Sequence, residues 1–82
     1  MTDFEKKKID VELRNFTTRN FERPNNCRNS NQIRFYVSEL CAMIEAYNKR
    51  FNYVPEGAYT LLHRYNAAQN SLVYLEFVKN YD

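Results

Sequence analysis

The sequence is short of the residues that build metal, cofactor and phosphate sites. Among its 82 residues it has one glycine, one histidine, two cysteines and no tryptophan. A single glycine excludes a glycine-rich phosphate-binding loop. One histidine and two cysteines without a Cys-x-x-Cys spacing argue against a zinc site, and two cysteines are too few for a secreted disulfide framework. We therefore expect no metal and no cofactor.

The few nucleophilic and basic side chains give little support for catalysis. Cys41 follows Leu40 inside an apolar helical pattern, so we expect it to be a buried and unreactive thiol. Cys27 falls in a polar loop, and His63 falls on the polar side of its segment, where we expect it to be solvated. The carboxylates are not paired on one helix face. These features indicate that the protein is not an enzyme.

Long apolar runs and one-sided charge are also missing. No run of 18 apolar residues is present, and the N-terminus MTDFEKKKIDVE alternates charges where a signal peptide is apolar. We therefore expect a soluble cytoplasmic protein with no membrane partner. Lys and Arg number 12 against 10 Asp and Glu, a formal net charge of +2. The excess lies in residues 1–34, which hold eight basic and five acidic residues.

Residues 1–21 are predicted to form an N-terminal helix. Thr2 and Glu5 match the T-x-x-E capping box at a helix start. Ile9, Leu13 and Phe16 then fall on one stripe of a helix. The stretch KIDVELR, residues 8–14, also alternates apolar and charged residues as a half-buried strand does, which leaves a strand as the alternative.

A polar linker, residues 22–31, is predicted to separate this helix from the next. It has one proline and four asparagines, and we expect Ser30 or Asn31 to cap the second helix. Residues 32–52 are predicted to form that helix, because its apolar side chains recur at spacings of 4, 3, 4, 3 and 4. This heptad seam consists of Ile33, Val37, Leu40, Ile44, Tyr47 and Phe51.

The stretch FNYVPEGAY, residues 51–59, is predicted to turn the chain between two helices. Val54 precedes a proline and is disfavoured in a helix, whereas Pro55 suits the first helical position. We expect a turn at residues 53–55 and a helix at residues 56–80. The seam of that helix consists of Leu61, Tyr65, Ala68, Leu72 and Leu75. Two long helices joined by so short a turn must lie antiparallel.

The expected fold is all-α and forms one domain, residues 1–82. It combines the N-terminal helix with the long antiparallel hairpin in a three-helix bundle, which we expect to dimerise through the hairpin. The alternative is a small α+β fold in which residues 8–14 and 72–78 pair as strands. LVYLEFV supports that alternative, because it is rich in β-branched and aromatic residues.

Surplus apolar surface is the main functional signal. After Leu72 the apolar face of the last helix rotates away from its seam, and large exposed apolar patches mark interaction sites. Tyrosine is favoured in such sites. The interface candidates are Phe35, Tyr53, Tyr59, Tyr74, Phe77, Val78 and Tyr81. We expect an adaptor, inhibitor or regulator that binds a protein partner and self-associates, unless the first helix covers these faces within one chain.

Nucleic-acid binding is the alternative function. Arginines recur every four to six residues through the N-terminal helix and the linker, together with phenylalanines and asparagines. Such side chains contact phosphates and stack on bases. The candidates are Arg14, Arg19, Arg23, Arg28 and Arg34. The low net charge of this region makes nucleic acid the weaker prediction of the two.

Overall fold

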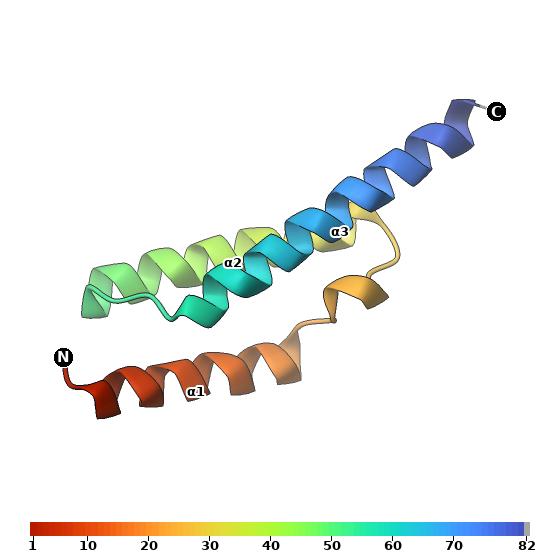
Figure 1. Ribbon diagram of the computed structural model, residues 1–82. Coiled ribbons are helices and arrows are strands. Elements are labelled where there is room, and N and C mark those ends of the chain that lie inside the picture. Colours follow the sequence, from red (N-terminus) through yellow and green to blue (C-terminus); the bar gives the residue numbers. More distant parts are fainter. Residues whose placement is uncertain (82) are drawn as a thin grey trace.

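The computed structural model describes the backbone of residues 1–81 and the side chains of residues 1–78. In chain order its elements are α1 (Asp3–Asn20), the short 3-10 helix η1 (Pro24–Asn26), α2 (Ser30–Phe51) and α3 (Glu56–Tyr81) (Figure 1). No strand occurs within residues 1–81. The predicted all-α three-helix bundle is confirmed. The α+β alternative is wrong, because residues 8–14 lie in α1 and residues 72–78 lie in α3.

The turn between α2 and α3 makes the predicted antiparallel hairpin. Asn52 ends α2 in the left-handed conformation (φ 51°, ψ 34°), which asparagine tolerates better than most residues. Its N–H donates to the carbonyl of Asn48 at 2.9 Å. Pro55 is buried and immediately precedes α3 instead of opening it, and its carbonyl accepts the N–H of Ala58 at 3.0 Å.

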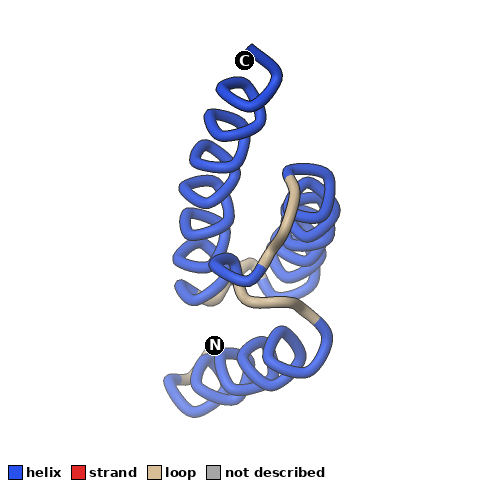
Figure 2. The backbone as a smooth tube through the Cα atoms, turned by 90° about the vertical axis from the view of Figure 1, so that its right-hand side faces the viewer, coloured by secondary structure: helices blue, strands red, loops and turns tan. Residues whose placement is uncertain are grey.

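Helix α1 lies against one side of the hairpin, alongside the N-terminal half of α3 (Figures 1 and 2). The two helices run in the same direction, because Leu13 contacts α3 at Gly57 and Phe21 contacts it at Tyr65. The predicted N-cap of α1 is present: the Glu5 N–H donates to Oγ1 of Thr2 at 3.1 Å.

The buried stripe of α1 differs from the predicted one at its third position. Ile9, Leu13 and Thr17 are buried, whereas Phe16 is 46% exposed. Thr17 is tolerated inside because its hydroxyl donates to the carbonyl of Leu13 at 3.0 Å. A polar residue thus occupies the turn that the apolar pattern assigned to Phe16.

The linker also folds more tightly than its composition predicts. Cys27 lies in the loop after η1, as predicted, and is buried there against Ile33, Leu40 and Tyr65. Cys41 is exposed, which corrects the prediction that it is the buried thiol. The cap of α2 is Asn29 instead of Ser30 or Asn31: its side chain accepts the Gln32 N–H at 2.8 Å.

Aromatic rings join the three helices at the centre of the core. The rings of Tyr36 and Tyr65 stack at 5.5 Å between centroids, and Phe21 lies 5.0 Å from Tyr36. Tyr65 is fully buried, and its hydroxyl donates to the carbonyl of Glu22, just after α1. Burial raises the pKa of the Tyr65 hydroxyl. One residue of α3 therefore fixes the end of α1 and the middle of α2 together.

Candidate interaction surfaces

The two arms of the hairpin have unequal lengths, which leaves one end of α3 uncovered. Helix α2 has 22 residues and α3 has 26. At the far end of the hairpin, the Glu76 carboxylate accepts hydrogen bonds from the backbone N–H of Ser30 at 3.3 Å and from its hydroxyl at 3.1 Å. Because α2 begins at Ser30, α3 extends beyond it after Glu76 (Figure 1).

The C-terminal half of α3 carries five large apolar side chains that are 39–66% exposed. We call them the C-terminal apolar surface: Val73, Tyr74, Leu75, Phe77 and Val78. Three predicted interface candidates, Tyr74, Phe77 and Val78, belong to it. The side chain of a fourth, Tyr81, lies outside the described residues.

Leu75 belongs to this surface although the heptad seam predicted it to be buried. It is 59% exposed. Leu75 precedes Glu76, which bonds Ser30, so this seam position lies at the level of the first turn of α2. That turn offers the polar residues Ser30 and Asn31 in place of an apolar partner. Val73 and Leu75 were both missed as surface residues. Counting residues outward from the turn would not have found them, because by count the 22 residues of α2 extend alongside α3 as far as Phe77.

The remaining interface candidates lie apart from this surface. Phe35 is 60% exposed on α2, with its ring edge-on to Tyr36 at 5.6 Å. Tyr59 is exposed near the start of α3. Tyr53 instead contacts α1: its hydroxyl donates to Asp10 at 2.9 Å, and the Lys6 ammonium lies 5.5 Å from its ring centroid. The hydrogen bond to Asp10 raises the pKa of Tyr53.

Gly57 faces a helix of its own chain. A Cβ built on Gly57 would lie 3.8 Å from Cδ2 of Leu13, an ordinary van der Waals distance. The structure gives α1 as the neighbour and leaves room for a methyl group.

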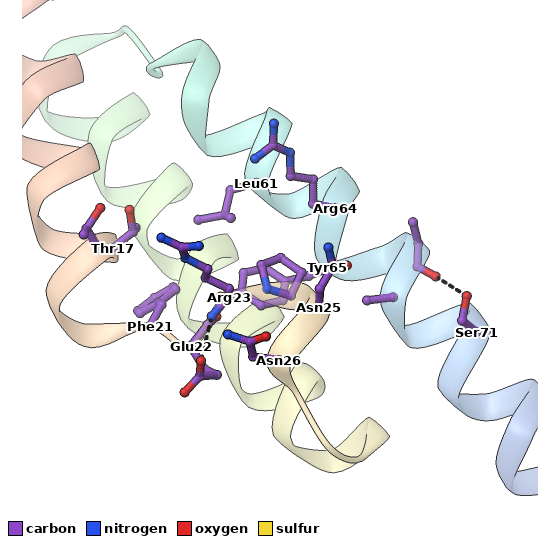
Figure 3. A pocket seen from close by; sticks show the side chains of 14 residues that line it. Thr17, Phe21, Glu22, Arg23, Asn25, Asn26, Leu61, Arg64, Tyr65 and Ser71 are labelled. Carbon is purple, nitrogen blue, oxygen red and sulfur yellow. Dashed lines mark hydrogen bonds between the residues drawn. The ribbon is translucent and has the colours of Figure 1, made fainter.

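A groove runs between α1, η1 and α3, and we call it the α1–α3 groove (Figure 3). It consists of two adjoining cavities of about 910 and 560 Å³, which share Thr17, Leu61 and Arg64 in their walls. Tyr65, Leu61 and Phe21 form the apolar part of its lining, and Asn25 and Asn26 of η1 form part of its polar side.

The groove brings together two of the five predicted arginines. Arg23 lines the larger cavity and Arg14 lines the smaller one. The other three are exposed on α1, the loop and α2: Arg19, Arg28 and Arg34. Arg64 of α3 lines both cavities and was missed, because no local pattern connects it with arginines forty or more positions earlier. Only the parallel packing of α1 on α3 places them together.

The thiols and the histidine do not assemble into a reactive site in the described part of the chain. Burial raises the pKa of the Cys27 thiol, so it is a poor nucleophile at neutral pH. His63 is exposed. No cluster of three His, Cys, Asp or Glu side chains that could hold a metal occurs among the described residues. None of the described helices has the length and apolar character needed to cross a membrane.

Comparison with known proteins adds no assignment. No protein-family model, no curated protein and no solved structure matches this chain. The functional proposal therefore rests on the surfaces of this chain itself.

Proposed function

We propose that the chain is a non-enzymatic helical interaction protein that binds through the C-terminal apolar surface, and that a second copy of the chain is its partner there. In this form it serves as an adaptor, inhibitor or regulator. The observation that carries the proposal is the exposure of five neighbouring large apolar side chains at one end of α3. Neither the side of α3 packed by α1 nor the start of α2 covers them.

The size of the surface favours a second copy. At roughly 150–250 Å² for a large side chain, the exposed fractions of these five residues, 39–66%, correspond to about 500 Å². That equals the largest apolar patches of typical monomers, which are often functional. Two copies facing each other would bury at most about 1,000 Å² in total, which is the size of a weak or transient interface.

The charge of the surface also suits pairing with itself. In a two-fold dimer each surface meets its own copy, so any net charge on it would be repulsive. Glu76 is the only charged residue between Leu72 and Val78, and its carboxylate bonds Ser30, so this charge lies at the contact between α3 and α2. Two α3 ends packed together would form a four-helix core with the two α2 helices.

Amide NMR spectra recorded during dilution test this proposal directly. Between about 1 mM and 20 µM, a range in which weak dimers dissociate, we expect the largest shifts at residues 72–78. The double variant Tyr74→Ser/Leu75→Ser should show none of these shifts. Phe4→Ser is the matched control, because it removes a more exposed apolar side chain on α1 and should leave them intact. Shifts centred on α1, or no shifts, would refute self-association through this surface.

Nucleic-acid binding through Arg14, Arg19, Arg23, Arg28 and Arg34 has weaker support. These arginines are divided among α1, the loop and α2, and only Arg14 and Arg23 line a common groove. Binding to phosphates would weaken steeply as salt rises. If the affinity for single-stranded DNA did not change between about 50 and 200 mM salt, this alternative would be excluded.

A further inference from the structure

The α1–α3 groove is a second surface with the dimensions of a peptide site. It follows α3 from Gly57 to Ser71. At 1.5 Å per helical residue this length is about 21 Å, the span of roughly six residues of extended chain. Its two cavities total more space than a single side chain fills, at about 910 and 560 Å³.

Two guanidinium groups enter the groove from different elements. Figure 3 shows the Arg23 side chain reaching from the η1 side toward Leu61, with Arg64 projecting from α3 and Glu22 directed away. Neither guanidinium forms a hydrogen bond or an ion pair with another described residue. The planar guanidinium fork binds a carboxylate through two parallel hydrogen bonds. The groove therefore has two guanidinium groups, those of Arg23 and Arg64, available to a ligand next to its apolar lining.

The charges around the groove disfavour a polyphosphate chain. Three arginines in its walls, Arg14, Arg23 and Arg64, are offset by three acids. These acids are Asp10, Glu22 and Glu56. Nucleic acids gain affinity by contacting many phosphates at once, and acids along the groove oppose this. A ligand with one or two carboxylates between apolar side chains avoids that repulsion.

We infer that the α1–α3 groove binds an extended peptide segment of a partner protein. An acidic side chain of the peptide lies between Arg23 and Arg64, and its apolar side chains lie on Leu61 and Phe21. Asn25 and Asn26 supply amides for the peptide backbone. The inference is independent of self-association, since the groove and the C-terminal apolar surface share no residue.

Selection from a displayed library of random octapeptides, with the full chain as bait, tests the inference. We expect enriched peptides to contain Asp or Glu next to apolar residues. Arg23→Gln/Arg64→Gln should weaken their binding about tenfold or more, since charge-assisted bonds are lost. Both side chains are exposed, so circular dichroism should show an unchanged helical spectrum. The control Arg34→Gln/Arg50→Gln removes two arginines outside the groove and should bind as the wild type does.

Three results would overturn the inference. The first is a selection that enriches no peptides, or peptides without acidic residues. The second is equal binding by the Arg23→Gln/Arg64→Gln variant and the wild type. The third is a labelled single-stranded oligonucleotide that binds the wild type and loses binding in that variant, because the groove would then belong to nucleic acid. Repeating the selection with Tyr74→Ser/Leu75→Ser should give the same peptides, which separates this site from self-association.

Discussion

At the scale of single residues, Tyr65 connects the protein's stability to pH. Its hydroxyl is buried and donates to the Glu22 carbonyl, and burial raises its pKa in the folded state above the usual value near 10. The unfolded chain therefore ionises first as pH rises. The stabilisation from a neutral Tyr65 is complete below about pH 10 and is lost at higher pH.

We expect Tyr65→Phe to lower the free energy of unfolding by about 1 kcal/mol at pH 8, because the Glu22 carbonyl loses its donor. Urea unfolding at pH 8 and at about pH 11 should show a smaller pH-dependent loss in this variant than in the wild type. Tyr59→Phe is the control, since Tyr59 is exposed and should change neither value. If stability fell equally with pH in the wild type, Tyr65→Phe and Tyr59→Phe, Tyr65 would not be the residue that connects stability to pH.

At Gly57 we expect a substitution to raise the stability of the protein, whereas Tyr65→Phe lowers it. Alanine is favoured over glycine in a helix, and its Cβ would meet Leu13 at 3.8 Å without a clash. We expect Gly57→Ala to raise the free energy of unfolding by about 0.5–1 kcal/mol in a urea titration. A lower free energy of unfolding for Gly57→Ala would show that α1 packs closer to α3 than the 3.8 Å between Leu13 and the Cβ position of Gly57.

The two cysteines should react at very different rates. Cys27 is buried with a raised pKa, and its thiol lies 3.5 Å from the Arg23 carbonyl, whereas Cys41 is exposed. With a chromogenic disulfide reagent at pH 8, we expect one fast and one slow thiol. Cys41→Ser should abolish the fast phase and Cys27→Ser should retain it. A fast phase that survives in Cys41→Ser would place Cys27 at the surface.

At the scale of elements, Glu76 ties the C-terminal half of α3 to the start of α2. Its carboxylate bonds Ser30 at the positive end of the α2 dipole. We expect Glu76→Ala to lower the free energy of unfolding by about 0.5–1 kcal/mol and to speed amide exchange in the first turn of α2. Glu45→Ala, at an exposed position within α2, should do neither. Unchanged exchange near Ser30 in Glu76→Ala would contradict this contact.

The sequence predicts the regular elements better than their ends and connections. Helical periodicity from Ile33 to Phe51 and the turn around Pro55 fix the hairpin, because both depend on local geometry. The burial of Cys27 depends on how η1 folds back on the core, which no periodic pattern reports. Leu75 shows the same limit: its spacing fits the seam, but burial requires an apolar partner, and the first turn of α2 at this level offers the polar residues Ser30 and Asn31.

For the candidate sites too, the sequence predicts what depends on one helix and misses what depends on tertiary packing. The rotation of the apolar face within one helix, which is a local property, predicts Tyr74, Phe77 and Val78 as candidates, and all three are exposed. The α1–α3 groove was not found, because its arginines come from elements that meet only through tertiary packing. Arg23 and Arg64 line one groove but are far apart in the sequence, so only the structure brings them together.

At the scale of the whole molecule, the chain is long and thin. Its principal extents are 55 × 21 × 15 Å, and its radius of gyration is 14.9 Å. A compact domain of this length would have a radius of about 12 Å. Few apolar side chains are fully buried in such a shape, and small domains have little stability to spare. Self-association through α3 would add the apolar burial that one chain lacks.

The mass of the protein in solution tests this central claim most directly. Sedimentation equilibrium at rising concentration should show the 9.9 kDa chain approaching twice its mass, and Tyr74→Ser/Leu75→Ser should remain at 9.9 kDa throughout. The Phe4→Ser control should associate as the wild type does. A wild-type mass of 9.9 kDa at every concentration up to about 1 mM would contradict self-association through the C-terminal apolar surface.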